Sequence, residues 1–290
     1  MWQILPTKVG IERAEILIEL SRLASFRNSR EESLALAEEA RDDLIKAGAA
    51  QSLMVKAYTA ESYALANLNR KTEAANVLGK VVEISRDNED PFIDDHLRMQ
   101  ATWYADMEDW QASLACQLEA IRVNEIDGDE QWLARSLFLA AGCYLNLKDY
   151  SLAIDHYKRA RVIYKTEKNV NEVGNCDIWI GECYATLGNG ELALTYGNQA
   201  LDIARLIDRT PWIVMSLLVI GKGRALLADF ERAENSLEEA HFTLIGFDSS
   251  QWALNIEIKS ELVKIYRQTD RSDLADEVEA RIATIREILE

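Results

Sequence analysis

The chain has 290 residues, and 48% of them are hydrophobic, which is enough to build a large core. Its 49 acidic and 32 basic residues give a net charge of −17, and no run of lysine or arginine is long enough to follow a phosphate backbone. We therefore expect neither nucleic acid nor an anionic membrane as a direct partner. The sequence has no apolar run of about eighteen residues, and Met1–Lys8 lacks the pattern of a signal peptide. We expect no membrane insertion and a cytoplasmic location.

A pattern of small residues recurs along the chain about every forty residues. Each copy has two anchor positions, seven residues apart. In chain order the anchors are Ser33 and Ala40, Ala74 and Val81, Ser113 and Ala120, Ala153 and Ala160, Ala193 and Ala200, Ala233 and Ala240, and Ala275 and Ile282. From Val81 onward the second anchor advances by 39, 40, 40, 40 and 42 residues. Such regular self-similarity predicts a stack of helical hairpins.

Two helices fit within each copy. In the fifth copy, Ile178 and Tyr184 follow a helical period, Gly188-Asn189-Gly190 interrupts it, and a second helical segment begins at Leu192. We therefore predict an all-α fold, an α-solenoid of about seven antiparallel hairpins that forms one superhelical domain over residues 1–290. The predicted repeats span residues 10–48, 50–88, 91–126, 130–168, 170–208, 210–248 and 250–290.

Prolines and glycines agree with this division. Pro91 and Pro211 are expected at the starts of first helices, where a missing backbone donor costs nothing. Gly221-Lys222-Gly223 falls inside a helical period, so we interpret its glycines as sites of close helix packing and not as a phosphate-binding loop.

The residues of the central copies resemble the tetratricopeptide repeat family. That family has a small residue, then an aromatic residue three positions later, then a glycine at the turn, and then an aromatic residue before the first small anchor. The fifth copy matches with Gly181, Tyr184, Gly188 and Ala193, and the fourth with Ala141, Tyr144, Tyr150 and Ala153. The third and sixth copies match in part, and the first two are degenerate, with Ser21 and Ser62 in the small-residue column.

A repeat of about forty residues exceeds the family's usual 34, which is similar to kinesin light chain and to the tetratricopeptide regions of bacterial peptide receptors and sensors. HEAT repeats have a similar length and are the rival architecture.

Cysteine and histidine do not form a recognisable site. Cys116, Cys143, Cys176 and Cys183 contain no CxxC pair, and Cys143 and Cys183 occupy one column of the repeat, so we interpret them as small core residues. His96, His156 and His241 fall in three different copies. No catalytic motif is present. We predict no metal, no cofactor, no catalytic residue and no enzymatic activity.

The resemblance implies that the first helix of each hairpin lines a concave groove that holds a partner. The residues that this places in the groove are Lys56, Tyr63, Asn67, Arg98, Arg135, Asn146, Asn175, Glu182 and Lys222. Asparagine amides can bond to an extended peptide backbone, and the cations can meet carboxylates. Large rings, among them Phe92, Trp132, Trp212 and Trp252, also start the first helices, and we interpret them as packing between repeats.

Three functions are compatible with this sequence. The favoured one is a non-catalytic scaffold or adaptor that binds a protein or peptide in the groove. The first alternative is a module of a regulatory system that senses a small ligand or a signal peptide. The second is a self-assembling structural protein, which the charged last helix, residues 274–289, disfavours because such a helix resembles a polar cap. A homo-oligomer is compatible with the sequence but is not predicted.

Overall fold

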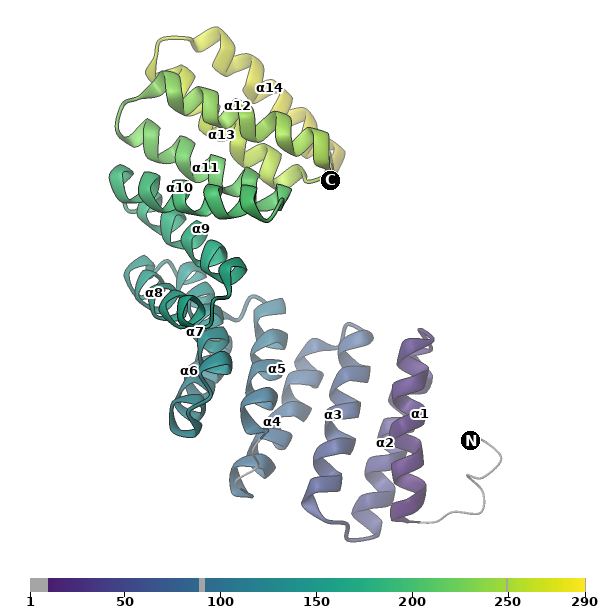
Figure 1. Ribbon diagram of the computed structural model, residues 1–290. Helices are drawn as coiled ribbons and strands as arrows, with labels where there is room; N and C mark the ends of the chain where they lie inside the picture. Colours follow the sequence, from purple (N-terminus) through teal and green to yellow (C-terminus); the bar gives the residue numbers. More distant parts are fainter. Residues whose placement is uncertain (1–9, 89–91, 249, 290) are drawn as a thin grey trace. The chain divides into compact units, whose positions relative to one another are not determined.

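The computed structural model describes residues 10–88, 92–248 and 250–289, and the secondary structure within these ranges is entirely helical (Figure 1). The helices are α1 (Ile11–Phe26), α2 (Arg30–Lys46), α3 (Gln51–Asn67), α4 (Lys71–Asp87), α5 (Ile93–Asp106), α6 (Trp110–Asp127), α7 (Glu130–Asn146), α8 (Tyr150–Thr166), α9 (Val170–Thr186), α10 (Gly190–Leu206), α11 (Thr210–Leu226), α12 (Phe230–Phe247), α13 (Trp252–Gln268) and α14 (Ser272–Leu289). The predicted all-α solenoid is confirmed.

The chain divides into two compact units, Met1–Leu147 and Lys148–Glu290. In unit 1, the hairpins α1–α2, α3–α4 and α5–α6 are followed by α7, and in Figure 1 the first helices α1, α3 and α5 follow one another in a row. In unit 2, α8 is followed by the hairpins α9–α10, α11–α12 and α13–α14, and α11 contacts both α9 and α13. A single domain over the whole chain stays a prediction.

The anchor positions form the core of the stack. Every anchor residue from Ser33 to Ile282 is buried. Their small side chains let the two helices of a hairpin and the next first helix approach closely. The residues that recur in the sequence are therefore the ones that pack between the helices.

The two degenerate copies form the same hairpin through hydroxyl groups. Ser21 Oγ donates to the carbonyl of Ser33 at 2.7 Å, and Ser62 Oγ donates to the carbonyl of Ala74 at 2.9 Å. Both serines are buried and bond to an anchor residue of the facing helix. Serine therefore replaces the usual glycine or alanine at this contact without opening the hairpin.

Helix starts repeat at half the period. Five residues spaced by twenty positions precede successive helices, and each side chain accepts a hydrogen bond from the backbone N–H three residues later. They are Asp109, Asp129, Asp149, Asn169 and Asn189. Such caps satisfy one of the free donors at a helix start and stabilise it by about 1 kcal/mol. Pro211 lies in the first turn of α11, as predicted, whereas Pro91 falls outside the described residues.

Glycines allow close approach on two sides of α11. Towards α10, a Cβ atom at Gly190 would lie 2.7 Å from the carbonyl oxygen of Gly223. Towards α12, a Cβ atom at Gly221 would lie 2.6 Å from Leu237 Cδ2. The predicted close packing at Gly221 and Gly223 is confirmed. The sequence placed Gly190 in a turn, but it is the buried first residue of α10, and Gly188 makes the turn with a φ of 77°.

Unit 2 buries one ion pair between α8 and α9. Asp177 is fully buried, its Oδ1 lies 2.5 Å from Arg161 Nε, and its Oδ2 lies 3.1 Å from Arg161 Nη2. Burial raises the pKa of Asp177, and the hydrogen bonds and charge of Arg161 oppose that rise. The guanidinium also donates to Gln199 of α10 at 3.1 Å and so links three helices.

A second buried charge in unit 2 has no carboxylate partner among the residues that the structure describes. Lys259 of α13 is 8% exposed, and its Nζ lies 3.4 Å from His241 Nε2 of α12. Burial, together with the charge of Arg281, lowers the pKa of Lys259. Burial and the charge of Lys259 lower the pKa of His241.

We predict that Lys259→Met stabilises the protein by roughly 1 kcal/mol, because an unpaired buried charge is replaced by an apolar side chain of similar length. Since the pKa of His241 is lower in the folded state, protonation of this ring favours unfolding. Stability should therefore be fully present above about pH 6.5 and decline as the pH falls through the folded pKa of His241. The variant should reduce this decline. Urea unfolding at pH 5.5 and 7.5 measures both effects, with Lys264→Met as the exposed control, and a destabilised Lys259→Met would contradict the prediction.

Candidate binding grooves

A groove in unit 1 lies along α1, α3, the end of α4 and the start of α5. Its volume is about 1360 Å³, and its wall includes Ile18 and Phe26 of α1, Val55 and Tyr63 of α3, and Phe92. Most of this wall comes from α1, α3 and α5, which are the first helices of their hairpins, and the resemblance predicted first helices for a partner's groove.

Aromatic rings stand exposed around this groove. Phe26 is 85% exposed, Phe92 is 61% exposed and Tyr63 is 49% exposed. Tyr63 is held by an edge-to-face contact with Trp103, with ring centroids 6.1 Å apart. Phe26 ends α1 and Phe92 precedes α5, so the two exposed phenylalanines stand at opposite ends of the groove. Exposed rings of this kind are typical of a surface that a partner covers.

The charges around the groove are mostly paired. Arg22 forms an ion pair with Glu19 at 3.0 Å, and Asp95 forms one with Arg98. Lys56 is exposed and has no ion-pair partner among the described residues. Asn67 Nδ2 donates to Ser25 Oγ at 3.2 Å, a bond between two exposed or half-exposed side chains. The groove therefore combines rings, amide groups and one available cation.

The predicted site residues of unit 1 separate into three places. Lys56, Tyr63 and Asn67 line the groove. Arg98 is buried, is paired with Asp94 and Asp95, and lies 3.9 Å from the ring centroid of Trp132.

The other two predicted residues of unit 1 belong to α7 and are not part of the groove wall. Arg135 is exposed, and Asn146 Nδ2 donates to the carbonyl of Gly142 in its own helix at 2.8 Å.

Unit 2 contains a smaller groove across α9, α11 and α13, with a volume of about 500 Å³, and Glu182 and Lys222 line it. Lys222 Nζ lies 2.7 Å from Glu182 and 2.7 Å from Glu257. Burial lowers the pKa of Lys222, but the two carboxylates outweigh this effect and the pKa is raised. The cation is therefore already neutralised within the protein. The remaining predicted residue, Asn175, donates to Glu172 at 3.2 Å and lies outside this groove wall.

The column of large rings is divided between packing and exposure. Trp212 is 8% exposed, and Cζ of Arg209 lies 3.9 Å from its ring centroid. Cζ of Arg98 lies at the same distance from the ring centroid of Trp132. Trp212 packs between repeats as predicted, whereas Trp132 is 37% exposed and is covered in part by Arg98. Phe92, in contrast, faces the groove of unit 1.

The cysteines are free thiols. Burial raises the pKa of Cys116 to about 11 and that of Cys183 to about 12, so both are protonated at neutral pH. In the described ranges, no three or more His, Cys, Asp and Glu side chains gather in a way that suits a metal ion. Among the same residues, no helix is long and apolar enough to cross a membrane.

Two family models describe the repeats of this chain. A tetratricopeptide repeat model matches residues 55–88, and a second matches residues 95–166. The protein carries tetratricopeptide repeats. The first match falls in the second copy, which the sequence had marked as degenerate. These tetratricopeptide repeats are of the long type, because successive first helices begin at Glu130, Val170 and Thr210, forty residues apart.

Solved structures share this fold. A signal transduction ATPase with numerous domains from Pyrococcus horikoshii, which has a tetratricopeptide repeat sensor, matches with a TM-score of 0.73 and 16% identity, over 96% of this chain and 43% of that one. The chain thus spans less than half of that protein.

Two further solved structures match in a similar way. A Rap protein complexed with competence and sporulation factor matches with a TM-score of 0.61 and 18% identity, over 94% of this chain and 76% of that one. Aspartyl phosphate phosphatase F from Bacillus subtilis matches with a TM-score of 0.62 and 12% identity, over 94% and 70%. At these identities the likeness establishes the fold alone. A search of curated protein sequences found no match.

Proposed function

We propose that this tetratricopeptide-repeat protein is a non-catalytic adaptor of the cytoplasm that binds a protein or peptide in the groove of α1, α3 and α5. The observation that carries this proposal is the groove of about 1360 Å³ with exposed Phe26 and Phe92 at its two ends. Small-molecule pockets usually have volumes of about 300–1,000 Å³ and bury most of their ligand. A longer, open groove fits a segment of polypeptide better.

The comparison structures support a role in interaction or sensing. One of them has a tetratricopeptide repeat sensor, and another is complexed with a factor. The third is named a phosphatase, so the fold is compatible with a catalytic protein. We propose binding alone for this chain, because the groove offers rings and amides while most of its charged side chains are held in ion pairs. Phosphate release from a phospho-aspartyl protein by the purified chain would contradict this part of the proposal.

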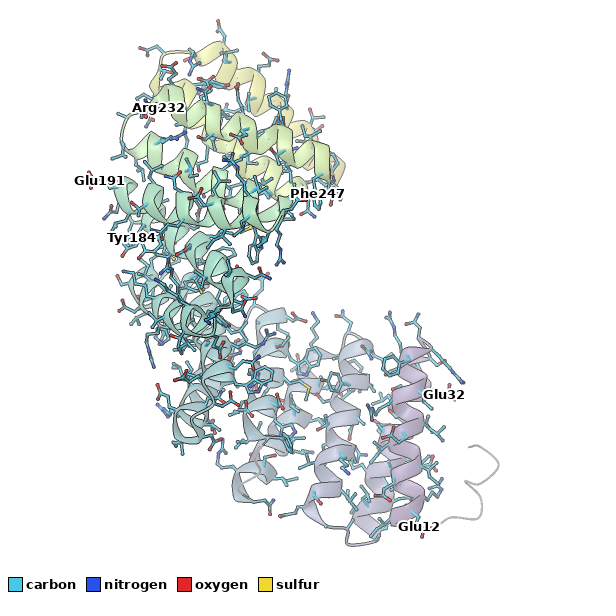
Figure 2. All side chains as sticks on the ribbon, viewed as in Figure 1. Glu12, Glu32, Tyr184, Glu191, Arg232 and Phe247 are labelled. Carbon is cyan, nitrogen blue, oxygen red and sulfur yellow. The ribbon has the colours of Figure 1, made fainter. Side chains whose placement is uncertain are left out.

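A pull-down from native cell extract with matched variants tests the groove. Phe26→Ser with Phe92→Ser removes two exposed rings from the groove, and Phe242→Ser with Phe247→Ser removes two exposed rings from α12. Phe247, labelled in Figure 2, is 55% exposed at the end of that helix. Because all four side chains are exposed, neither variant should change the free energy of unfolding by more than about 0.5 kcal/mol.

The expected result is a partner that the wild type and the α12 variant capture and the groove variant loses by tenfold or more, since removing two large rings from an interface removes much of its apolar contact area. Equal capture by both variants would contradict the groove assignment. No captured protein, together with a higher melting temperature in the presence of a small molecule, would favour the sensing alternative. An apparent mass that falls on dilution would favour self-assembly.

A further inference from the structure

Lys259 occupies a position of the repeat that other copies fill with leucine. It lies sixteen positions before Ala275, the first anchor of its copy. Four other copies have a buried leucine at the same distance from their own first anchors, namely Leu17, Leu97, Leu137 and Leu217. Leucine therefore suits this position, and a buried ammonium group adds a free-energy cost that the packing does not require.

One other copy also buries a charge at this position, and there the protein supplies the counterion. Asp177 has the same place in its copy as Lys259, and Arg161 of the preceding helix neutralises it. In the later copy His241 has the place of Arg161, since each of them directly follows a second anchor. The arrangement of a buried ion pair is thus present twice, but in the later copy it consists of a cation and an imidazole.

The ammonium group of Lys259 has more donors than it has acceptors near it. It carries three N–H donors, and its one acceptor among the described residues is Nε2 of His241, at 3.4 Å. Arg281 of α14 adds a further positive charge in this neighbourhood and forms its own ion pair with Glu277. Two donors and a full positive charge of Lys259 therefore stay unmatched within the described part of the chain.

Two more polar atoms beside this lysine are buried without a partner. Asn255 precedes Lys259 by one turn on the same face of α13, and its Oδ1 has no hydrogen-bond partner among the described residues. The same is true of Nδ1 of His241, whose ring neighbours the side chain of Asn255. Buried polar atoms are nearly always hydrogen-bonded. Unmatched donors and acceptors on three adjacent side chains are what a small polar ligand needs in order to bind.

The charge and the donors determine the class of this ligand. A carboxylate carries one negative charge and two acceptor oxygens, which match one ammonium group with two free donors. A phosphate group carries up to two charges and three acceptor oxygens, so a single lysine suits it less well. A hydroxyl group next to the carboxylate would donate to Oδ1 of Asn255. Because Lys259 and Asn255 are buried, the ligand must also be small.

We infer that Lys259, His241 and Asn255 form a site for a small 2-hydroxy carboxylate, whose carboxylate pairs with Lys259 and whose hydroxyl group donates to Asn255. The bound ligand would link α12 to α13. All three residues belong to unit 2, so the inference does not depend on the groove of unit 1.

Thermal unfolding of the full chain with glycolate as the probe tests the inference, at neutral pH and with chloride keeping the ionic strength constant. We expect the melting temperature to rise by about 3 °C at a glycolate concentration several times the dissociation constant, because the ligand binds the folded state alone. Acetate, which lacks the hydroxyl group, should need about fivefold more for the same rise. Glycolamide, which lacks the charge, should give no rise.

Three variants separate this site from a general effect of the anion. Lys259→Met should abolish the response, whereas Lys264→Met removes an exposed lysine of the same helix and should keep it. His241→Glu supplies a carboxylate within the protein, as Asp177 does for Arg161. It should therefore melt at a higher temperature than the wild type without any ligand, and it should not respond to glycolate.

The contrary outcomes are equally specific. The site would be overturned by the absence of any rise with glycolate, by an equal rise with glycolamide, or by a rise that Lys259→Met retains. Should Lys259→Met fail to fold, a glycolate response retained by His241→Glu would overturn the site in its place. Equal responses to acetate and glycolate would overturn the hydroxy-acid class. The pull-down with the groove variants tests the proposed function separately, since those variants leave unit 2 or Lys259 unchanged.

Discussion

Arg161→Met is expected to lower the free energy of unfolding by about 3–5 kcal/mol at pH 7, because it leaves the fully buried carboxylate of Asp177 without its cation. Urea unfolding of the full chain measures this loss. The double variant Arg161→Met with Asp177→Leu is the matched control, since it removes both charges. We expect the double variant to be within about 1–2 kcal/mol of the wild type.

The pH dependence of Arg161→Met identifies the cause of its instability. Burial already raises the pKa of Asp177, and without Arg161 only the charge of Lys165 opposes this rise. A carboxyl group whose pKa is higher in the folded state binds its proton more tightly there, so stability falls as the pH rises above the unfolded value of about 4. The defect should therefore be largest at neutral pH and shrink as the pH falls towards 4. A defect that stays constant over this range would show that lost packing of the arginine, and not the buried charge, is responsible.

Gly190→Ala is expected to destabilise the protein by roughly 2–3 kcal/mol. The added Cβ would lie 2.7 Å from the carbonyl oxygen of Gly223 and 3.0 Å from Leu226 Cβ, so the backbones of α10 and α11 must separate. Thermal and urea unfolding measure the effect.

Gly246→Ala is the control for the same chemical change. A Cβ at Gly246, in the last turn of α12, meets no atom within 4 Å. Alanine is also the better helix former, so this variant should be neutral or more stable by up to about 1 kcal/mol. Equal effects of the two substitutions would refute the close contact between α10 and α11.

The fold could be predicted from the sequence because the small residues that recur along the chain are the ones that pack between helices. The anchor residues from Ser33 to Ile282 were recognisable as small residues at a fixed spacing, and a buried contact between helices needs that property. The caps from Asp109 to Asn189 were not used in the prediction, although their spacing of twenty residues could have located the starts of five successive helices. The division into two units near Leu147 was not visible, because no change in composition accompanies it.

The candidate site was predictable only at positions where the place of a residue in the repeat determines whether its side chain is exposed. Lys56, Tyr63 and Asn67 line the unit 1 groove as the resemblance implied. Arg98 was predicted for the same groove face, but Asp94 and Asp95 lie one turn before it and hold it in ion pairs. That spacing was readable in the sequence as a helical ion pair.

Two features of the groove depended on tertiary structure. Phe26 ends α1 and is not covered by the next hairpin, although a phenylalanine at the end of a helix is usually packed. Lys222 differs from Lys56 because carboxylates from α9 and α13 reach it. Neither outcome follows from the helical period, since both depend on how separate hairpins pack, and the two partners of Lys222 are 40 and 35 residues away in the chain.

Hydrogen exchange of the full chain, with and without the partner captured in the pull-down, tests the central claim most directly. Binding in the proposed groove predicts slower exchange in residues 18–26, 51–67 and 92–98, which belong to α1, α3 and α5. The helices α9, α11 and α13 should be unchanged. Protection confined to those helices, or to the exposed end of α12, would contradict the assignment of the binding site to the groove of unit 1.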